Sequence, residues 1–190
     1  MSAAKALGSA PVTAAQRRII DAALLLFVEH GISGTSLQMI ADALGVTKAA
    51  VYHQYNAKDE IVLAVAQVVL SRLEAAVVAA EAERSRPRAR EVLVIAMVDL
   101  AVEQRRMAGI LQRDPVMLRF LERHAPFRRV IARVNRVLMG GTSNPETRVQ
   151  AATLAAAISG AVVHPLVVDF DDETLRAHLR TQVRKLLRLR

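Results

Sequence analysis

The chain has 190 residues and no cysteine; 53% of its residues are hydrophobic and only 3% are aromatic. This length and composition exclude a disulfide-stapled miniprotein and a wholly disordered chain, and the lack of cysteine excludes thiolate metal sites. The formal net charge of +8 suggests an anionic partner, but the basic residues are spread along the chain. Because β-branched and aromatic strand formers are sparse, we expect an all-helical, cytoplasmic protein.

The amino-terminal region is predicted to begin with a flexible arm, residues 1–12, since it lacks the apolar run of a signal peptide. Thr13 and Gln16 then have the spacing of a capping box, which predicts the start of the first helix. Apolar residues recur on one face of this helix up to Gly31. The left-handed conformation open to glycine predicts that the helix ends there.

Two short helices are predicted next. Thr35 and Gln38 form a second capping-box pattern ahead of an apolar stripe, and Gly45 should end that helix. Thr47 is expected to cap a third helix that runs to about His53. The region therefore predicts three helices joined by tight turns.

These three helices are predicted to form an amino-terminal domain over residues 13–58, followed by a larger helical domain over residues 59–190. The further helices, which bring the total to about nine, are predicted over 58–84, 91–104, 115–123, 126–139, 145–168 and 172–189. Pro165 should kink or end its helix. The predicted fold class is all-α.

The uncharged run over residues 149–168 is long enough to cross a membrane. It consists mostly of Ala and Val and includes Gln150, Thr153 and His164, so its transfer into lipid would gain little and its polar groups would need partners. We therefore expect a buried helix and no membrane partner. A helical ligand carrier or a membrane-associated protein is the alternative class.

Residues 36–55 have the spacing of a helix-turn-helix. Ala41 is small where two helices would cross, Gly45 permits the positive φ of the turn, and Val51 would close the core between the helices. The same pattern is common at helix ends in general. These three positions alone therefore leave both DNA binding and a plain structural role open.

The whole segment of residues 35–58 resembles the DNA-binding segment of tetracycline-repressor-like regulators, the TetR family, and the resemblance extends over residues 13–65. Two positions depart from the family pattern: Gln54 stands where His is usual, and Tyr55, expected in the core, stands where Phe is usual. The resemblance implies a helix-turn-helix domain that binds double-stranded DNA. It also implies a carboxy-terminal helical domain for effector binding and dimerisation.

The resemblance further implies which side chains meet DNA. Lys48 and Ala49 open the helix that enters the major groove, where they would reach a guanine or phosphate and a thymine methyl. Tyr52 and Lys58 match positions that hold the phosphate backbone. The predicted DNA-binding residues are Gln38, Thr47, Lys48, Ala49, Tyr52, His53 and Lys58. For the first of these, a helix-capping role is an equally good explanation.

The last two helices predict a dimer surface. Small residues recur every four positions in one helix, which lets another helix approach closely, and the other helix carries an apolar stripe. The predicted interface consists of Ala152, Ala156, Gly160, Leu175, Leu179 and Val183. The alternative is that these residues fill the subunit's own core. The resemblance implies a homodimer, and such a dimer would bind a palindromic operator with half-sites about one DNA turn apart.

The middle helices are expected to enclose a pocket for a small-molecule effector. Met and Phe side chains would give it an adaptable apolar lining, although each also suits a plain core. The predicted lining is Met97, Asp99, Met107, Leu111, Met117, Phe120, Phe127 and His164. Asp99 interrupts an uncharged run, so it is either paired with an arginine or faces the cavity, where it would favour a cationic ligand.

No enzyme motif accompanies these signals. The nucleophile-elbow, dinucleotide-binding, P-loop and zincin patterns are missing from the sequence, and the five histidines are scattered. We therefore predict a protein that is not an enzyme and needs no cofactor or metal. The predicted function is ligand-responsive regulation of transcription, most simply as a repressor, with an activator of the same fold as the alternative.

Overall fold

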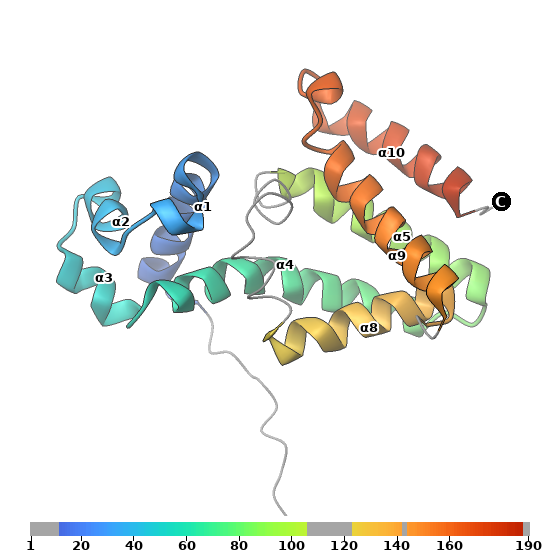
Figure 1. Cartoon of the computed structure of the whole chain (residues 1–190), viewed down its shortest axis with the longest axis horizontal. Helices are drawn as coiled ribbons and strands as arrows, with labels where there is room; N and C mark the ends of the chain where they lie inside the picture. The colour runs from blue at the N-terminus through green and yellow to red at the C-terminus, as the bar shows by residue number, and fades with distance from the viewer. Residues whose placement is uncertain (1–11, 106–122, 142–143, 188–190) are drawn as a thin grey trace, which may run out of the picture. The chain divides into compact units, whose positions relative to one another are not determined.

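The computed structural model describes residues 12–105, 123–141 and 144–187. Within these ranges the regular elements are eight α-helices and one short 3-10 helix (Figure 1), which confirms the all-α fold class. Two predictions, most of the amino-terminal arm and nearly all of the helix over 115–123, lie outside the described residues. The chain divides into two compact units, Met1–Val65 and Ala66–Arg190, which we name unit 1 and unit 2.

Unit 1 begins with α1 (Ala14–Gly34), which starts where the sequence predicts. The Thr13 hydroxyl accepts a hydrogen bond from the Gln16 N–H, and the Gln16 side-chain oxygen accepts one from the Thr13 N–H, each at 3.1 Å. Gly31 has a φ of 70°, but a further helical turn follows it. Gly31 therefore kinks α1 instead of ending it.

The second predicted capping box is wrong by one residue. Ser36, and not Thr35, caps α2 (Leu37–Leu44), because the Ser36 hydroxyl accepts from the Met39 N–H at 3.1 Å. Thr35 is only 1% exposed, and its hydroxyl donates to the carbonyl of Gly31 at 2.8 Å. The Thr35 side chain is thus held inside unit 1, at the kink of α1.

The turn after α2 and the third helix agree with the prediction. Gly45 ends α2 in the left-handed conformation, with a φ of 65°. Thr47 caps α3 (Lys48–Gln54), because its hydroxyl oxygen accepts from the Ala50 N–H at 3.2 Å. Val51 is fully buried where α3 packs against α1 and α2.

The core of unit 1 is built from apolar side chains of α1, α2 and α3 and of the first turns of α4 (Lys58–Glu81). Its buried members are Ile19, Ile20, Ala23, Phe27, Ile32, Leu37, Ile40, Ala41, Val51, Tyr55, Ile61, Val62 and Val65. Since these residues come from every helix of the unit, the core fixes the orientation of α3.

The described part of unit 2 contains the remainder of α4 and four further α-helices. These are α5 (Arg86–Glu103), α8 (Ala125–Met139), α9 (Pro145–Ala161) and α10 (Asp172–Leu186), with a 3-10 turn at Pro165–Val167. The helix predicted from residue 91 begins earlier because Ser85 caps it and its first turn accommodates proline. The helix predicted over 145–168 ends at Ala161, which divides the uncharged run.

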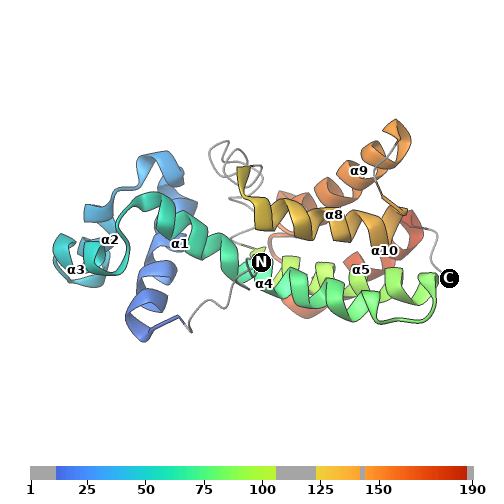
Figure 2. The ribbon, with the colours of Figure 1, turned by 90° about the horizontal axis from the view of Figure 1, so that it is seen from below.

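The helices of unit 2 surround a single apolar core. Both α8 and α10 pack against α5 and α9 (Figure 1 and Figure 2). The most buried core residues are Leu70, Val77, Ala80, Leu93, Val94, Val98, Val102, Val130, Val134, Leu138, Leu154, Ile158, Val162, Leu175 and Val183. This core draws on each of the five described helices of unit 2.

Among the described helices, one has the length and composition of a membrane span. This helix is α4, with a mean hydropathy of 2.0 over its most apolar stretch. Its apolar residues are shared between two cores, with Ile61 and Val65 buried in unit 1 and Val77 and Ala80 buried in unit 2. Burial against protein covers only part of this apolar surface: 33% of the most apolar stretch is buried, while Val68 and Val78 are exposed.

Candidate nucleic-acid interface

One face of α3 is exposed, and it carries most of the predicted DNA-binding residues. Lys48, Ala49, Tyr52 and His53 are all exposed, as is the cap residue Thr47. The side chains of these residues reach solvent along the length of α3, while Val51 faces the core. Five of the seven predicted DNA-binding residues therefore lie on one exposed surface, formed by α3 and its cap residue.

Lys48 and Tyr52 are in contact on this surface. The Lys48 ammonium lies 5.6 Å from the centre of the Tyr52 ring. The two residues are one helical turn apart, and their contact is a cation–π interaction. The Tyr52 side chain is 44% exposed. A hydroxyl donor and a cation are therefore held side by side on the outer face of α3.

Tyr55, the residue that follows α3, is buried in the core of unit 1. This residue is 8% exposed, which agrees with its predicted place in the core. Burial raises the pKa of the Tyr55 hydroxyl, and the nearby Glu60 carboxylate raises it further. Tyr55 is therefore neutral at physiological pH and serves as a core residue at the end of α3.

Lys58 is half-buried and has a structural role that the sequence did not reveal. Its ammonium donates hydrogen bonds to the carbonyl oxygens of Ile32, at 2.7 Å, and Thr35, at 2.9 Å. These bonds tie the start of α4 to the turn between α1 and α2. An ammonium has three N–H donors, so only the third is available for the predicted phosphate contact.

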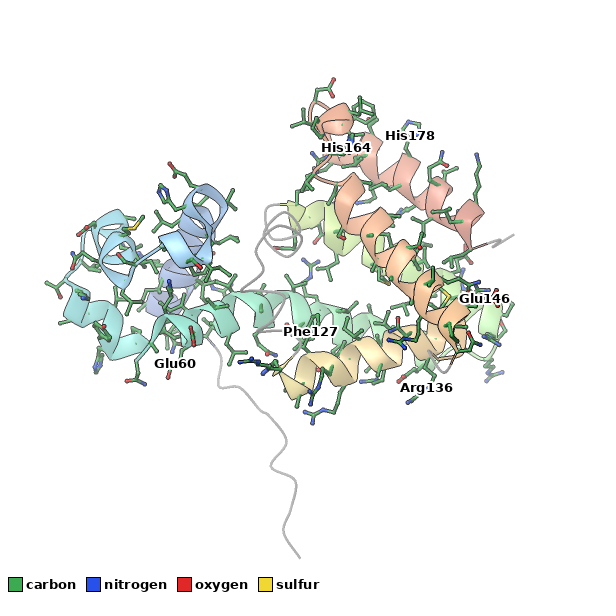
Figure 3. The ribbon with its side chains drawn as sticks, in the orientation of Figure 1. Glu60, Phe127, Arg136, Glu146, His164 and His178 are labelled. Atoms are coloured by element: carbon green, nitrogen blue, oxygen red, sulfur yellow. The ribbon has the colours of Figure 1, made fainter. Side chains whose placement is uncertain are left out.

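The start of α4 also has its own carboxylate. Glu60, which Figure 3 shows on the first turn of α4, accepts a hydrogen bond from the Asn56 N–H at 2.9 Å. This negative group lies at the end of the helix where a phosphate would be favoured. The exposed residues of α3 are therefore better placed to bind a phosphate than the start of α4 is.

Gln38 is exposed on α2, but it does not cap the helix. Its amide nitrogen donates to the Asp42 carboxylate at 2.7 Å, a pair one turn apart on the same helix. The capping explanation for Gln38 is wrong, because Ser36 supplies the cap. Contact of Gln38 with a base remains a prediction, and such a contact would compete with Asp42.

The predicted effector-pocket residues are only partly described, and those that are described lie apart. Met107, Leu111, Met117 and Phe120 fall outside the described residues. Met97 and Phe127 are half-buried and pack against the unit-2 core. His164 is exposed and its Nδ1 accepts from the Leu166 N–H at 3.2 Å; Figure 3 shows it far from Phe127.

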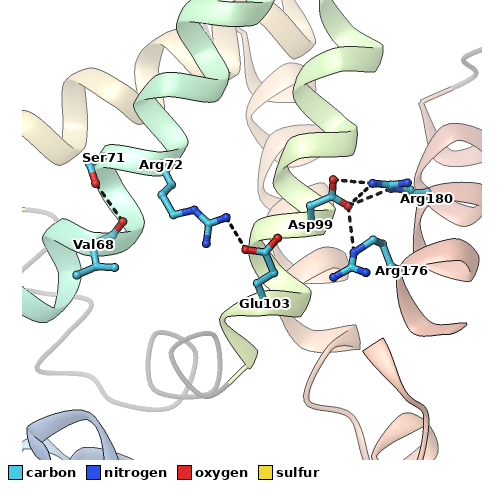
Figure 4. Close-up of polar contacts among 7 residues, drawn as sticks. All are labelled: Val68, Ser71, Arg72, Asp99, Glu103, Arg176 and Arg180. Carbon is cyan, nitrogen blue, oxygen red and sulfur yellow. Dashed lines mark hydrogen bonds and ion pairs between the residues drawn. The ribbon is translucent and has the colours of Figure 1, made fainter. Parts of the chain in front are cut away.

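Asp99 takes the first of its two predicted roles, pairing with arginine. The Arg180 guanidinium donates to its carboxylate at 2.6 Å, and Arg176 lies 3.4 Å away (Figure 4). On the same helix, Glu103 pairs with Arg72 of α4. Asp99 is therefore part of an ion-pair cluster that joins α5 to α10.

Half of the predicted dimer surface needs correction. Leu175, Leu179 and Val183 are buried inside unit 2, at 2%, 9% and 2% exposed, so they form the subunit's own core. Their apolar stripe is used against α5 and α9 of the same chain. On α9, Ala152 is exposed, so its predicted contact with another helix stays a prediction.

The arrangement of α2, the following turn and α3 in unit 1 defines the structural class of this part of the chain. A short second helix, a left-handed glycine turn and a capped third helix with an exposed polar face make a helix-turn-helix. This class is confirmed by comparison with known proteins. Residues 19–65 match the family model described as bacterial regulatory proteins of the tetR family.

Two curated relatives and one solved structure extend this match. The HTH-type transcriptional regulator SrpR of Pseudomonas putida is 39% identical over 84 residues, which are 44% of this chain and 38% of SrpR. The HTH-type transcriptional repressor AcnR of Corynebacterium efficiens is 31% identical over 68 residues, 36% of each protein. AibR, solved in complex with isovaleryl coenzyme A and operator DNA, aligns with a TM-score of 0.66 at 16% identity, over 88% of this chain and 97% of AibR.

The matched segments span well under two thirds of the length of either curated relative. The likeness to AibR, by contrast, is one of fold and covers 88% of this chain. The resemblance read from the sequence is confirmed: the helix-turn-helix segment, residues 19–65, matches the TetR family, and its curated relatives are named as transcriptional regulators.

Proposed function

We propose that this protein is a transcriptional regulator that binds double-stranded DNA through α3. The observation that carries the proposal is the division of α3 into two faces. Val51 is 0% exposed and fixes the helix to the core, while Lys48, Ala49 and Tyr52 face outward. The operator DNA in the AibR complex supports the same assignment, since the two chains share a fold.

The exposed residues of α3 divide into base contacts and backbone contacts. Lys48 would donate to guanine O6 or N7 or to a phosphate, and the Ala49 methyl would touch a thymine methyl. The Tyr52 hydroxyl would donate to a phosphate, with His53 and Thr47 at the edges of the same surface. Lys48 and Ala49 would therefore contribute to the preference of the protein for particular DNA sequences, and Tyr52 would contribute to its affinity for DNA of any sequence.

The protein is proposed to act as a homodimer in the cytoplasm. The small, exposed side chain of Ala152 on α9 would let a helix of a second subunit approach closely. A two-fold pair would place two copies of α3 in successive major grooves, about 34 to 36 Å apart, and read a palindromic operator. Neither an enzymatic activity nor a membrane partner forms part of this proposal.

Repression released by a small molecule is the proposed mode of regulation. The relative AcnR is named a repressor, and AibR was solved with an acyl coenzyme A bound. An effector would release the operator only if it binds the low-affinity conformation more tightly. Activation by the same fold is the second mode, and transcription in vitro from a promoter with the bound operator separates the two.

The test is selection of bound duplexes from a random library with the purified full chain at a stated salt concentration. A palindromic sequence should be enriched, and Lys48→Ala should bind it about tenfold more weakly. Arg129→Ala, which removes the same charge from an exposed position on α8, is the matched control and should bind normally. Failure to enrich any duplex would overturn DNA binding, and normal binding by Lys48→Ala would overturn the assignment of α3.

A further inference from the structure

Unit 2 contains a cavity whose described walls include none of the predicted effector-pocket residues that the structure describes. Its volume is about 620 Å³, within the range of small-molecule sites. It lies where the start of α5, the end of α8, the start of α9 and the end of α10 meet. Its walls include Arg90, Met139, Gln150, Leu154 and Leu187.

Among the described residues that line the cavity, the one cation is Arg90, and no described carboxylate forms an ion pair with its guanidinium. Its Nη2 donates to the Leu187 carbonyl at 3.3 Å, while its Nε is buried without a hydrogen-bond partner in the described part of the chain. The carboxylate next in sequence, Glu91, is already paired with Arg88 and Arg184. A buried donor of this kind costs free energy unless a ligand or water satisfies it.

A second guanidinium strengthens the positive character of this end of unit 2. Arg86 lies against the end of α8, where a Cβ added to Gly140 would come within 2.9 Å of its Nη2. Burial lowers the pKa of Arg90, and the charge of Arg86 lowers it further. An anion placed beside Arg90 would favour the charged guanidinium and so oppose both of these effects on its pKa.

The other groups of the cavity define the rest of a ligand. Glu146, on the first turn of α9 in Figure 3, is exposed and accepts a hydrogen bond from Gln150 at 3.2 Å, so it lies at the rim. Leu154 and Leu187 are 4% and 9% exposed and give the inner wall an apolar surface. The cavity thus combines an inner cation with an apolar wall.

We propose that this cavity binds a small organic anion with an apolar body, with its carboxylate on the Arg90 guanidinium and its hydrocarbon part against Leu154 and Leu187. A guanidinium pairs with a carboxylate through two parallel hydrogen bonds, and the free Nε is one of the donors that this geometry uses. The site is independent of α3. Its occupancy can therefore be tested without DNA.

The probe is decanoate, titrated into the full chain by calorimetry, with decanol and decylamine as neutral and cationic molecules of the same chain length. Decanoate should bind at least about tenfold more tightly than either of these, because only it pairs with Arg90. Equal binding of the three would overturn the proposal. So would preferred binding of decylamine, which would assign the head group to Glu146.

Three variants locate the site. Arg90→Gln should weaken decanoate binding about tenfold and leave decanol binding unchanged, while Arg88→Gln, on the same helix but outside the cavity, should change neither. Thr153→Trp, from an exposed position on the wall, should fill the cavity and abolish binding even if Arg90→Gln fails to fold. Undiminished decanoate binding by Thr153→Trp would overturn the proposal, whatever the result of the DNA selection.

Discussion

At the scale of single residues, two tyrosines three positions apart have opposite roles. Tyr52 is 44% exposed on the outer face of α3, while Tyr55 is 8% exposed and closes the core of unit 1. The same chemical group is thus available for DNA at one position and unavailable at the other. Removing each hydroxyl separately distinguishes a binding role from a packing role.

We predict that Tyr52→Phe weakens DNA binding by about three- to tenfold on all sequences, because one phosphate hydrogen bond is lost. Its melting temperature should stay unchanged, since the hydroxyl is exposed. Tyr55→Phe is the matched control and should bind DNA normally. Gel-shift titrations on the selected operator and on random duplex measure both variants. A Tyr52→Phe loss confined to one sequence would contradict the phosphate role.

Asp171, the residue that caps α10, gives a prediction about acid. The pKa of its carboxyl is lowered, because the Thr174 N–H and then the Thr174 hydroxyl donate hydrogen bonds to it. A group whose pKa is lower in the folded state stabilises the protein above its unfolded pKa, about 3.9 for aspartate. That stabilisation is lost as the pH falls from there through the lower, folded pKa.

Asp171→Asn keeps a hydrogen-bond acceptor at the cap but removes the charge. We expect the wild type to melt at a higher temperature than Asp171→Asn near neutral pH, because a negative charge is favoured at a helix start. The difference should shrink as the pH falls below about 3.9 and disappear below the lowered pKa of the folded carboxyl, where both caps are neutral. Asp169→Asn, two residues earlier and exposed, is the control. A difference that did not change with pH would refute this assignment.

At the scale of elements, the turn between α2 and α3 depends on one glycine. Gly45 has a φ of 65°, and a Cβ placed there would meet nothing within 4 Å. A side chain at this position is therefore opposed by backbone strain and not by crowding. The orientation of α3 relative to α2 rests on that left-handed residue.

Gly45→Ala should lower the free energy of unfolding by about 1 kcal/mol, and Gly45→Asn by less, because Asn tolerates the left-handed region. Gly34→Ala provides the contrast: its φ is not in that region and its Cβ would lie 3.5 Å from the His30 Cβ, an ordinary contact. Urea unfolding followed by circular dichroism measures all three. Equal losses for Gly34→Ala and Gly45→Ala would show that φ is not the cause.

The elements also show what the sequence could predict. The caps at Thr13 and Thr47 and the turn at Gly45 were predictable because each depends on residues within one turn of the chain. Thr35 and Ser36 offer the same hydroxyl one position apart, and only burial against α1 decides between them. Lys58 bonds carbonyls more than 20 residues earlier, which no local pattern encodes.

The same limit applies to the dimer surface. The apolar stripe of α10 correctly indicates burial, but a periodic pattern does not specify which chain supplies the opposing surface. Leu175 and Val183 are buried by their own subunit. By contrast, the exposed face of α3 was predictable, since its inner position, Val51, was identified from the spacing of the helix-turn-helix.

At the scale of the whole molecule, the net charge of +8 does not come from the DNA-binding unit. Residues 1–65 contain five Lys or Arg and five Asp or Glu. A single unit 1 therefore offers few phosphate contacts, and its affinity for DNA should be modest. Tight and specific binding would require two units acting together on one operator, which makes dimerisation a condition of function.

Ala152→Arg tests that condition, because a long charged side chain on the exposed face of α9 would block the close approach of a second helix. We expect the variant to sediment as a monomer at micromolar concentration and to lose at least about tenfold in operator affinity, since the second unit no longer binds at high effective concentration. Ala132→Arg, the same change at an exposed position on α8, should remain dimeric and bind normally. A monomeric variant with full operator affinity would mean that one copy of α3 suffices, and the palindromic operator would no longer follow.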